Sequence, residues 1–197
     1  MKGVILDFDT IGPDDLDTSI LLSLPISWQI YGNTSFNEVN ERIRYADVVL
    51  TNKVELSNEN IKQAANLKLI GLFATGTNII DLEAASDKNI CVSNAVAYCT
   101  DSVVQHVWAL ILALTTRIFD YSQAATDGRW ERSNSFCVMD YSVKELAGKT
   151  LGVVGAGELG RAVASVGLAF GMNVKYALFP ERHSCLHDNR LEFKALL

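Results

Sequence analysis

The sequence lacks the features that mark a secreted, membrane-spanning or zinc-binding protein. The longest apolar run, Val107–Leu114, is far shorter than the roughly 20 residues that a membrane-spanning helix needs. Asp7 interrupts the N-terminal apolar segment before a secretory signal could form. The 4 cysteines and 3 histidines do not have the spacing of a zinc site. These absences predict a cytoplasmic protein with reduced cysteines, without a metal site and without a membrane partner.

Positive charge is also scarce. The chain carries 17 basic against 23 acidic residues, a net charge of −6, so no general attraction to phosphate backbones or anionic lipids is expected. No repeat, low-complexity segment or Gly/Ser-rich linker divides the 197 residues. With 49% hydrophobic and 20% charged residues, the composition is that of a folded globular protein. It argues against a nucleic-acid partner.

Short apolar segments alternate with segments of helical spacing in the first half of the chain. We interpret five of them as strands: Gly3–Asp7, Ser27–Tyr31, Asp47–Leu50, Lys68–Leu72 and Asn89–Val92. Helices are expected over Leu16–Leu24 and Asn37–Tyr45, and after Ser57 as an N-cap. This alternation is typical of a parallel sheet with helical crossovers. We therefore predict an α/β fold with a flavodoxin-like domain over residues 1–98.

A different pattern begins near residue 99. One long helix is expected from Ser102 to about Tyr121, too apolar on all sides for a surface helix and therefore packed between elements or between subunits. His106 within it is expected in a core or an interface. A strand, a turn, a helix and a second strand follow from Thr150 onward. Residues 99–197 are therefore predicted to form the N-terminal part of a Rossmann dinucleotide-binding domain, which is incomplete here.

The sharpest motif is GAGELG, which begins at Gly155. It follows an apolar strand, Thr150–Val154, and precedes a helix over Arg161–Phe170, and this context distinguishes a dinucleotide-binding turn from a chance GxGxxG. The first glycine permits the tight turn, Gly157 lets the backbone approach a pyrophosphate, and Gly160 allows close packing of the helix on the strand. Free N–H groups at the start of the helix would then bind the phosphates.

The strand after this helix, Asn173–Leu178, ends without the acidic residue that normally binds the adenosine ribose. Leu178 stands at that position, and Glu181 and Arg182 follow it. We therefore expect a relaxed choice between NAD and NADP, with Arg182 as a partner for a 2′-phosphate. The alternative is that Glu181 bends back to the ribose.

Five stretches together indicate a family: Gly71–Ala85, Ser102–His106, Gly128–Trp130, Glu145–Thr150 and the GAGELG turn. Their order and spacing resemble the D-isomer-specific 2-hydroxyacid dehydrogenases, particularly the branch of glycerate dehydrogenases and hydroxypyruvate reductases. The resemblance extends from about residue 45 to residue 178, whereas the first 45 residues match only in pattern.

The resemblance implies the reduction of hydroxypyruvate or glyoxylate to D-glycerate or glycolate, with NAD or NADP as the cofactor. In that family the backbone amides of the first stretch bind the substrate carboxylate; by position they belong here to Ala74, Thr75 and Gly76, and Thr75 also lies near the nicotinamide. The resemblance further implies a homodimer formed through the 102–121 helix. The cofactor-binding positions fall on Thr75, Gly155, Gly157, Glu158, Leu159, Gly160 and Leu178.

The catalytic Arg, Glu and His of that family lie well beyond the phosphate loop. Here Leu197 is the last residue, 19 positions after Leu178, and the histidines His106, His183 and His187 are poorly placed as substitutes. We assign no catalytic residue and expect a partial sequence of a longer dehydrogenase, or a shortened product, that is inactive by itself. The alternative function is a non-catalytic, dinucleotide-binding dimerisation module.

A competing motif follows the first predicted strand. Asp7-Phe8-Asp9-Thr10 resembles the nucleophile motif of haloacid-dehalogenase-type phosphatases, in which both aspartates hold magnesium. The other motifs of that class are missing at the later strand ends, so the match lacks its structural context. We interpret Asp7 and Asp9 as strand-end caps that face solvent.

Overall fold

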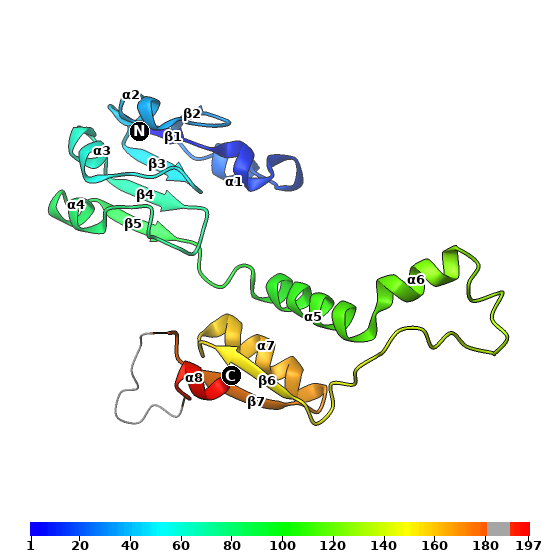
Figure 1. Cartoon of the computed structure of the whole chain (residues 1–197). Helices are drawn as coiled ribbons and strands as arrows, with labels where there is room; N and C mark the ends of the chain where they lie inside the picture. Colours follow the sequence, from blue (N-terminus) through cyan, green and yellow to red (C-terminus); the bar gives the residue numbers. More distant parts are fainter. Residues whose placement is uncertain (181–189) are drawn as a thin grey trace. The chain divides into compact units, whose positions relative to one another are not determined.

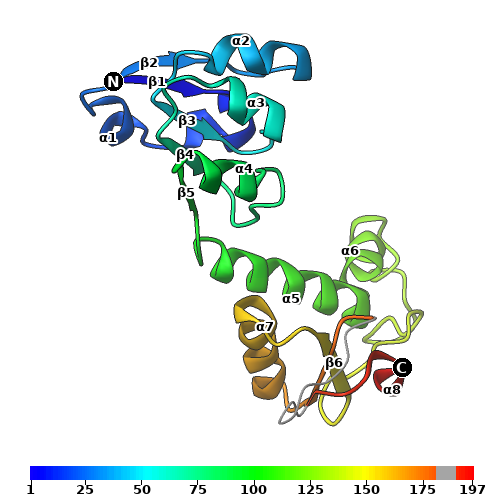
Figure 2. The ribbon, with the colours of Figure 1, turned by 90° about the vertical axis from the view of Figure 1, so that its left-hand side faces the viewer.

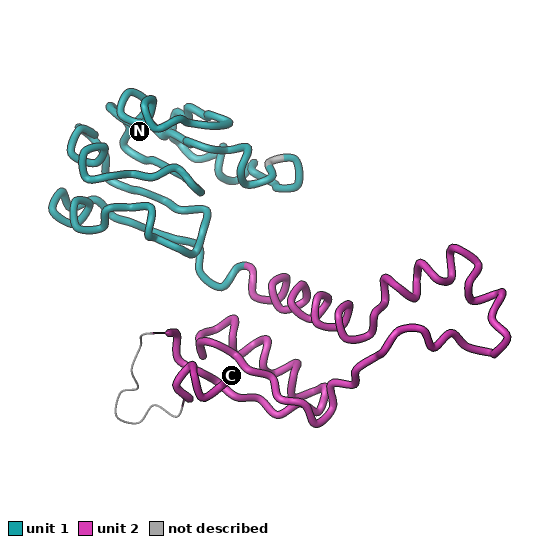
Figure 3. The backbone as a smooth tube through the Cα atoms, viewed as in Figure 1, with its two compact units in different colours: residues 1–98 teal, residues 99–197 magenta. Residues whose placement is uncertain are grey.

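The computed structural model describes residues 1–180 and 190–197. The chain divides into two compact units, Met1–Tyr98 and Cys99–Leu197 (Figure 3). Each unit contains parallel strands connected by helices, so the predicted α/β fold class is confirmed.

The first unit is a five-stranded parallel sheet with the strand order β2-β1-β3-β4-β5. Its strands are β1 (Lys2–Ile5), β2 (Ser27–Ile30), β3 (Val48–Thr51), β4 (Leu69–Leu72) and β5 (Cys91–Asn94). This order is flavodoxin-like, and the direction of winding reverses between β1 and β3. Because all pairs are parallel, the carboxyl ends of the five strands meet at one edge of the sheet (Figure 1).

Helices cover one face of this sheet. The helices and 3₁₀ turns of the unit are η1 (Phe8–Ile11), η2 (Pro13–Asp15), α1 (Ser19–Leu22), η3 (Phe36–Glu38), α2 (Val39–Ile43), α3 (Asn58–Gln63) and α4 (Leu82–Asp87). α2, α3 and α4 lie on the same face (Figures 1 and 2). Val4, Val49 and Ile70 are paired across the sheet and pack in one buried core with Ile43 and Ile61 of these helices. This core fixes the strand register.

Two of the predicted helices are shorter than expected. The helix expected over 16–24 is only the four-residue α1, which ends before Pro25 because proline disfavours the helical conformation of the residue that precedes it. The segment 37–45 begins as the 3₁₀ turn η3, and α2 ends at Ile43. The N-cap prediction for Ser57 is confirmed: its Oγ accepts the N–H of Asn60 at 3.4 Å.

The second unit has a two-stranded parallel sheet in its described part. Its elements are α5 (Thr100–Thr116), α6 (Ile118–Thr126), β6 (Thr150–Val154), α7 (Glu158–Ala169), β7 (Asn173–Ala177) and α8 (Phe193–Leu196). α5 lies beside α7 (Figures 1 and 2). Trp108 of α5 makes this contact: its ring stacks on Phe170 with the centroids 4.9 Å apart, and its Nε1 donates to the Val163 carbonyl at 3.1 Å.

The prediction of one long helix over 102–121 is wrong. α5 ends at Thr116, Arg117 adopts a left-handed conformation with φ 56° and ψ 35°, and α6 begins at Ile118 with a bend of 63° between the two helices. The sequence offers no glycine or proline at the break. The Nε of Arg117 donates to the Asp120 carboxylate, in the first turn of α6, at 2.6 Å.

The expectation that this helix packs between elements is not met within the described residues. Trp108 is the only buried residue of α5, whereas Leu110 and Leu114 are 53% and 77% exposed, and His106 is also exposed. The core position expected as one alternative for His106 is therefore wrong, and the interface position stays a prediction. Across residues 1–180 and 190–197, no single helix is long and apolar enough to span a membrane; α5 and α6 meet the length and composition criteria only together, as a bent pair.

The bend at Arg117 predicts an unusual order of stability. A left-handed conformation costs a residue other than glycine about 1–2 kcal/mol. The free energy of unfolding of Arg117→Gly should therefore exceed that of Arg117→Ala by about 1 kcal/mol. Both variants lack the contact with Asp120, so the difference reports the backbone alone. Urea denaturation measures the difference. In a continuous helix the order would reverse, because alanine is favoured over glycine there, and that result would contradict the bend.

Candidate functional site

The loop after β4 presents unpaired backbone donors at the carboxyl edge of the first sheet. The N–H of Phe73 still donates to the Thr51 carbonyl at 2.9 Å and thus extends the β3–β4 ladder. Beyond it, the N–H groups of Ala74, Thr75 and Gly76 donate to no residue in the part of the chain that the structure describes. The three residues predicted to bind a carboxylate are therefore consecutive, and their donors are available.

The carbonyl groups of the same loop are held on the β5 side. The Ala74 carbonyl accepts the N–H of Ala95 at 3.1 Å, and the Thr75 carbonyl accepts the side-chain Nδ2 of Asn94 at 2.7 Å. The described peptide bonds are all trans, so each carbonyl points opposite to the N–H that follows it. The N–H groups of Thr75 and Gly76 consequently point away from β5. Successive N–H groups of this kind form an anion-binding concavity.

The GAGELG turn joins β6 to α7 with the geometry that its glycines predict. Gly155 has φ +96°, which only glycine adopts readily, and its N–H donates to the Ala177 carbonyl at 2.9 Å. A Cβ on Gly160 would lie 2.3 Å from the Gly155 carbonyl oxygen, so the helix and the turn approach too closely for any side chain. A Cβ on Gly157 would meet no atom within 4 Å. Of the three glycines of this turn, only Gly157 therefore borders open space among the described residues.

The first turn of α7 leaves a second set of backbone donors unpaired. The N–H groups of Glu158, Leu159 and Gly160 have no acceptor among the described residues, and the first backbone hydrogen bond of the helix is donated by Arg161 to Gly157 at 3.0 Å. The Glu158 carboxylate accepts a hydrogen bond from the Thr100 hydroxyl. The positive end of the helix dipole adds to the attraction of these donors for an anion.

The ribose end of the predicted cofactor site is only partly described. Leu178 is 2% exposed, and its N–H donates to the Leu191 carbonyl at 2.9 Å. Its side chain therefore offers no open surface in this structure, and its place among the cofactor contacts stays a prediction. Glu181 and Arg182, together with His183 and His187, lie outside the described residues.

Asp7 does not face solvent, so this part of our interpretation is wrong. Its side chain is 2% exposed, and its two carboxylate oxygens accept the N–H groups of Asn52 at 2.9 Å and Lys53 at 2.6 Å. Asp7 thus ties the end of β1 to the turn after β3. Asp9 is exposed, as expected. Because both Asp7 oxygens are used by the backbone, its geometry favours a structural role over that of a phosphatase nucleophile.

Two surface hollows of the first unit lie at different places on its sheet. One of about 690 Å³ lies beside the edge strand β2 and α2 and is lined by residues that include Gln29, Glu38 and Arg42. The Ser35 hydroxyl and N–H hold the pKa of Glu38 below its ordinary value, with Arg42 contributing further. Another, of about 370 Å³, includes Asp7 and Lys53 at the carboxyl ends of β1 and β3. No three His, Cys, Asp or Glu side chains of the described residues are grouped as metal ligands.

Comparison with known proteins places these loops in a family. Residues 24–175 match the model of the D-isomer specific 2-hydroxyacid dehydrogenase catalytic domain. The hydroxypyruvate reductase of Blautia hydrogenotrophica is 36% identical over 177 residues, which cover 88% of this chain and 55% of that protein. The glycerate dehydrogenase of Methylorubrum extorquens is 35% identical over 171 residues, which cover 85% of this chain and 54% of that protein.

A solved structure agrees with these sequence matches. The D-lactate dehydrogenase from Aquifex aeolicus, complexed with NAD and lactic acid, superposes with a TM-score of 0.70 at 28% identity, over 93% of this chain and 53% of that one. The chain spans about half the length of the relatives it matches. The family model itself covers most of the chain. This protein therefore belongs to the D-isomer-specific 2-hydroxyacid dehydrogenase family.

Proposed function

We propose that this protein takes part in an NAD- or NADP-dependent D-2-hydroxyacid oxidoreductase reaction, the reduction of hydroxypyruvate or glyoxylate to D-glycerate or glycolate. The observation that carries the proposal is the presence of two strand-end loops, each with three consecutive N–H groups that lack an acceptor among the described residues. Residues 1–98 form the substrate-binding domain, and residues 99–197 form the first part of the cofactor-binding domain. The names of the relatives support the substrate class.

The first loop binds the substrate carboxylate through Ala74, Thr75 and Gly76. A hydrogen bond to a charged group contributes about 1.5–3 kcal/mol, so several amides hold a small keto acid without a large pocket. The keto carbon is bonded to the carboxylate carbon, so binding of the carboxylate also fixes the distance of the keto carbon from the loop. We further propose, on the family resemblance, that Thr75 lies beside the nicotinamide.

The second loop binds the cofactor pyrophosphate through the N–H groups of Glu158, Leu159 and Gly160. The absence of a side chain at Gly157 leaves the space through which a phosphate approaches this helix end. A bound dinucleotide in its reduced form would supply the hydride for carbonyl reduction. Leu178 carries no charge that would repel a 2′-phosphate, so we propose that both NAD and NADP are accepted.

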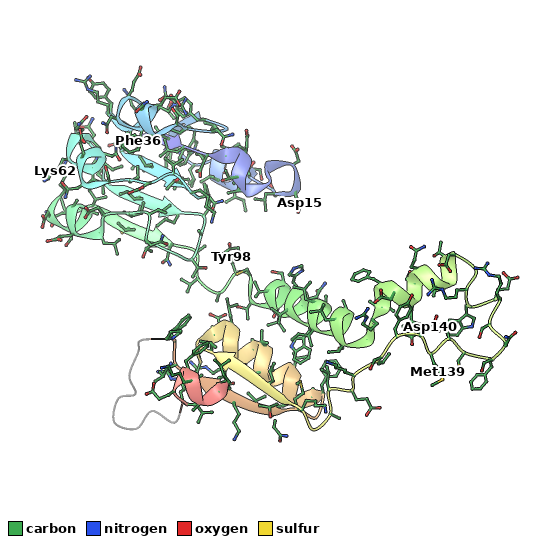
Figure 4. All side chains as sticks on the ribbon, in the orientation of Figure 1. Asp15, Phe36, Lys62, Tyr98, Met139 and Asp140 are labelled. Carbon is green, nitrogen blue, oxygen red and sulfur yellow. The ribbon has the colours of Figure 1, made fainter. Side chains whose placement is uncertain are left out.

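The exposed apolar side of α5 and α6 forms a homodimer interface in this proposal. Leu110, Leu114 and Phe119 are 53%, 77% and 77% exposed, an apolar patch that a monomer would leave in water. Met139, on the segment between α6 and β6, is also 83% exposed (Figure 4). The family resemblance supports this proposal, because it implies a homodimer formed through residues 102–121.

The cellular location in this proposal is the cytoplasm. Cys91, Cys99 and Cys137 form no disulfide bond, and Cys185 lies outside the described residues. Free cysteines agree with a reducing compartment.

NADH titration tests the phosphate loop. A Cβ at Gly157 would meet no atom within 4 Å, so Gly157→Val should keep the thermal unfolding midpoint while NADH binding, followed by fluorescence, falls at least about tenfold. Gly160→Ala is the contrasting control: it should lower stability by about 1–3 kcal/mol and binding together, because its Cβ overlaps the turn. Equal NADH affinity of Gly157→Val and wild type, or no binding by the folded wild type, would refute the cofactor site.

The proposed dimer interface predicts that an exposed phenylalanine matters for the oligomeric state only where it lies on α5 or α6. Phe119→Ser should shift the protein from dimer to monomer in sedimentation velocity, because it removes an apolar group from the interface. Phe36→Ser is the matched control, since Phe36 is 73% exposed and Phe119 77%, but Phe36 lies on η3 in the first unit. A dimer that tolerates the change at Phe119, or a monomeric wild type, would exclude this interface.

A further inference from the structure

We propose that Asn94 is a positioning residue for the substrate carboxylate and that it acts through the Thr75–Gly76 peptide. This inference rests on the proposed function of the loop formed by Ala74, Thr75 and Gly76. Asn94 is the last residue of β5 and is paired in register with Leu72, the last residue of β4. It therefore lies next to the point where the loop leaves the sheet.

The two carbonyl contacts of the loop depend differently on the sequence. The Ala74 carbonyl accepts a backbone N–H, that of Ala95, which any residue other than proline would supply. The Thr75 carbonyl accepts only the side-chain amide of Asn94 among the described residues. One side chain thus sets the direction of the Thr75 carbonyl and, across the planar peptide, the direction of the Gly76 N–H.

Nothing else in the described loop holds this peptide. Thr75 and Gly76 are both exposed, so packing does not fix their orientation. Glycine is also the residue whose backbone rotates most freely. When the bond from Asn94 is removed, the peptide can turn, and the Gly76 N–H no longer stays beside its neighbour at Thr75. The affinity for an anion that both N–H groups bind is then lower.

The chemistry of the side chain predicts an order among variants. Asn94→Ala removes the donor. Asn94→Asp removes it as well and, when ionised, adds a negative charge beside a site for an anion, so it should be worse than alanine. When protonated, the same Asp carries an O–H that can donate to the Thr75 carbonyl. Asn94→Gln keeps an amide donor on a longer stem and should restore part of the affinity.

The experiment is a titration of the ¹⁵N-labelled chain with hydroxypyruvate, in which the Thr75 and Gly76 amide signals are followed by NMR. In the wild type both signals should shift to saturation. Asn94→Ala should weaken hydroxypyruvate binding about tenfold, as expected for the loss of one hydrogen bond to a charged group, that from the Gly76 N–H to the carboxylate. Ser93→Ala is the matched control, since Ser93 precedes Asn94 on β5 and is exposed; it should bind like the wild type.

A pH series separates positioning from a general loss of structure. Because the ordinary pKa of an aspartate is about 3.9, lowering the pH from 7 toward 4.5 should raise the affinity of Asn94→Asp for hydroxypyruvate. The affinity of Asn94→Ala should stay level over the same range. Loss of the negative charge alone would bring Asn94→Asp only to the affinity of Asn94→Ala, so a rise above that level identifies the donated hydrogen bond as the cause.

The outcomes distinguish this inference from the function on which it rests. If hydroxypyruvate leaves the Thr75 and Gly76 signals of the wild type unmoved, the carboxylate site is wrong and the inference falls with it. If the wild type binds there and Asn94→Ala binds equally well, the carboxylate site stands and the role of Asn94 is refuted. An Asn94→Asp variant whose affinity at low pH does not rise above that of Asn94→Ala would refute it too.

Discussion

The planar trans peptide is the constraint on which the candidate sites depend. Fixing a carbonyl also fixes the N–H on the opposite side of the same peptide, so the protein aims a donor by holding an acceptor. In the loop after β4, two carbonyls held by Asn94 and Ala95 turn the N–H groups of Thr75 and Gly76 the other way. No charged side chain is needed to create an anion site, which suits a protein with a net charge of −6.

The two loops reach the same result by different means. After β4, hydrogen bonds from the end of β5 hold the loop, because parallel strands bring their carboxyl ends to one edge. After β6, the shape of the glycines is decisive: Gly155 makes the turn at φ +96°, and Gly160 allows α7 to begin against it. The free donors then belong to the first turn of a helix. The first arrangement suits a single carboxylate, and the second suits a diphosphate.

The features that depend on residues close together in the sequence could be predicted from it. The apolar segments located the strands of both units, and the spacing of Gly155, Gly157 and Gly160 predicted the turn. The break at Arg117 was not predictable, because neither glycine nor proline marks it, and an Arg–Asp pair three residues apart is equally compatible with a continuous helix. The burial of Asp7 was missed for a similar reason, since its partners Asn52 and Lys53 are far along the chain and lie near only after β1 and β3 pair. Asn94 shows the same limit: the predicted strand ended at Val92, two residues before it, and its contact with Thr75 depends on the strand order.

The central claim is that free backbone N–H groups at strand ends are the ligand contacts of this protein. An ¹⁵N–¹H correlation map of the wild-type chain with and without NADH tests it most directly. We predict that the amide signals of Glu158, Leu159 and Gly160 shift most, while those of Gln29 and Arg42 in the large hollow beside β2 stay in place. Shifts centred on that hollow, with the signals of the first turn of α7 unmoved, would contradict the account.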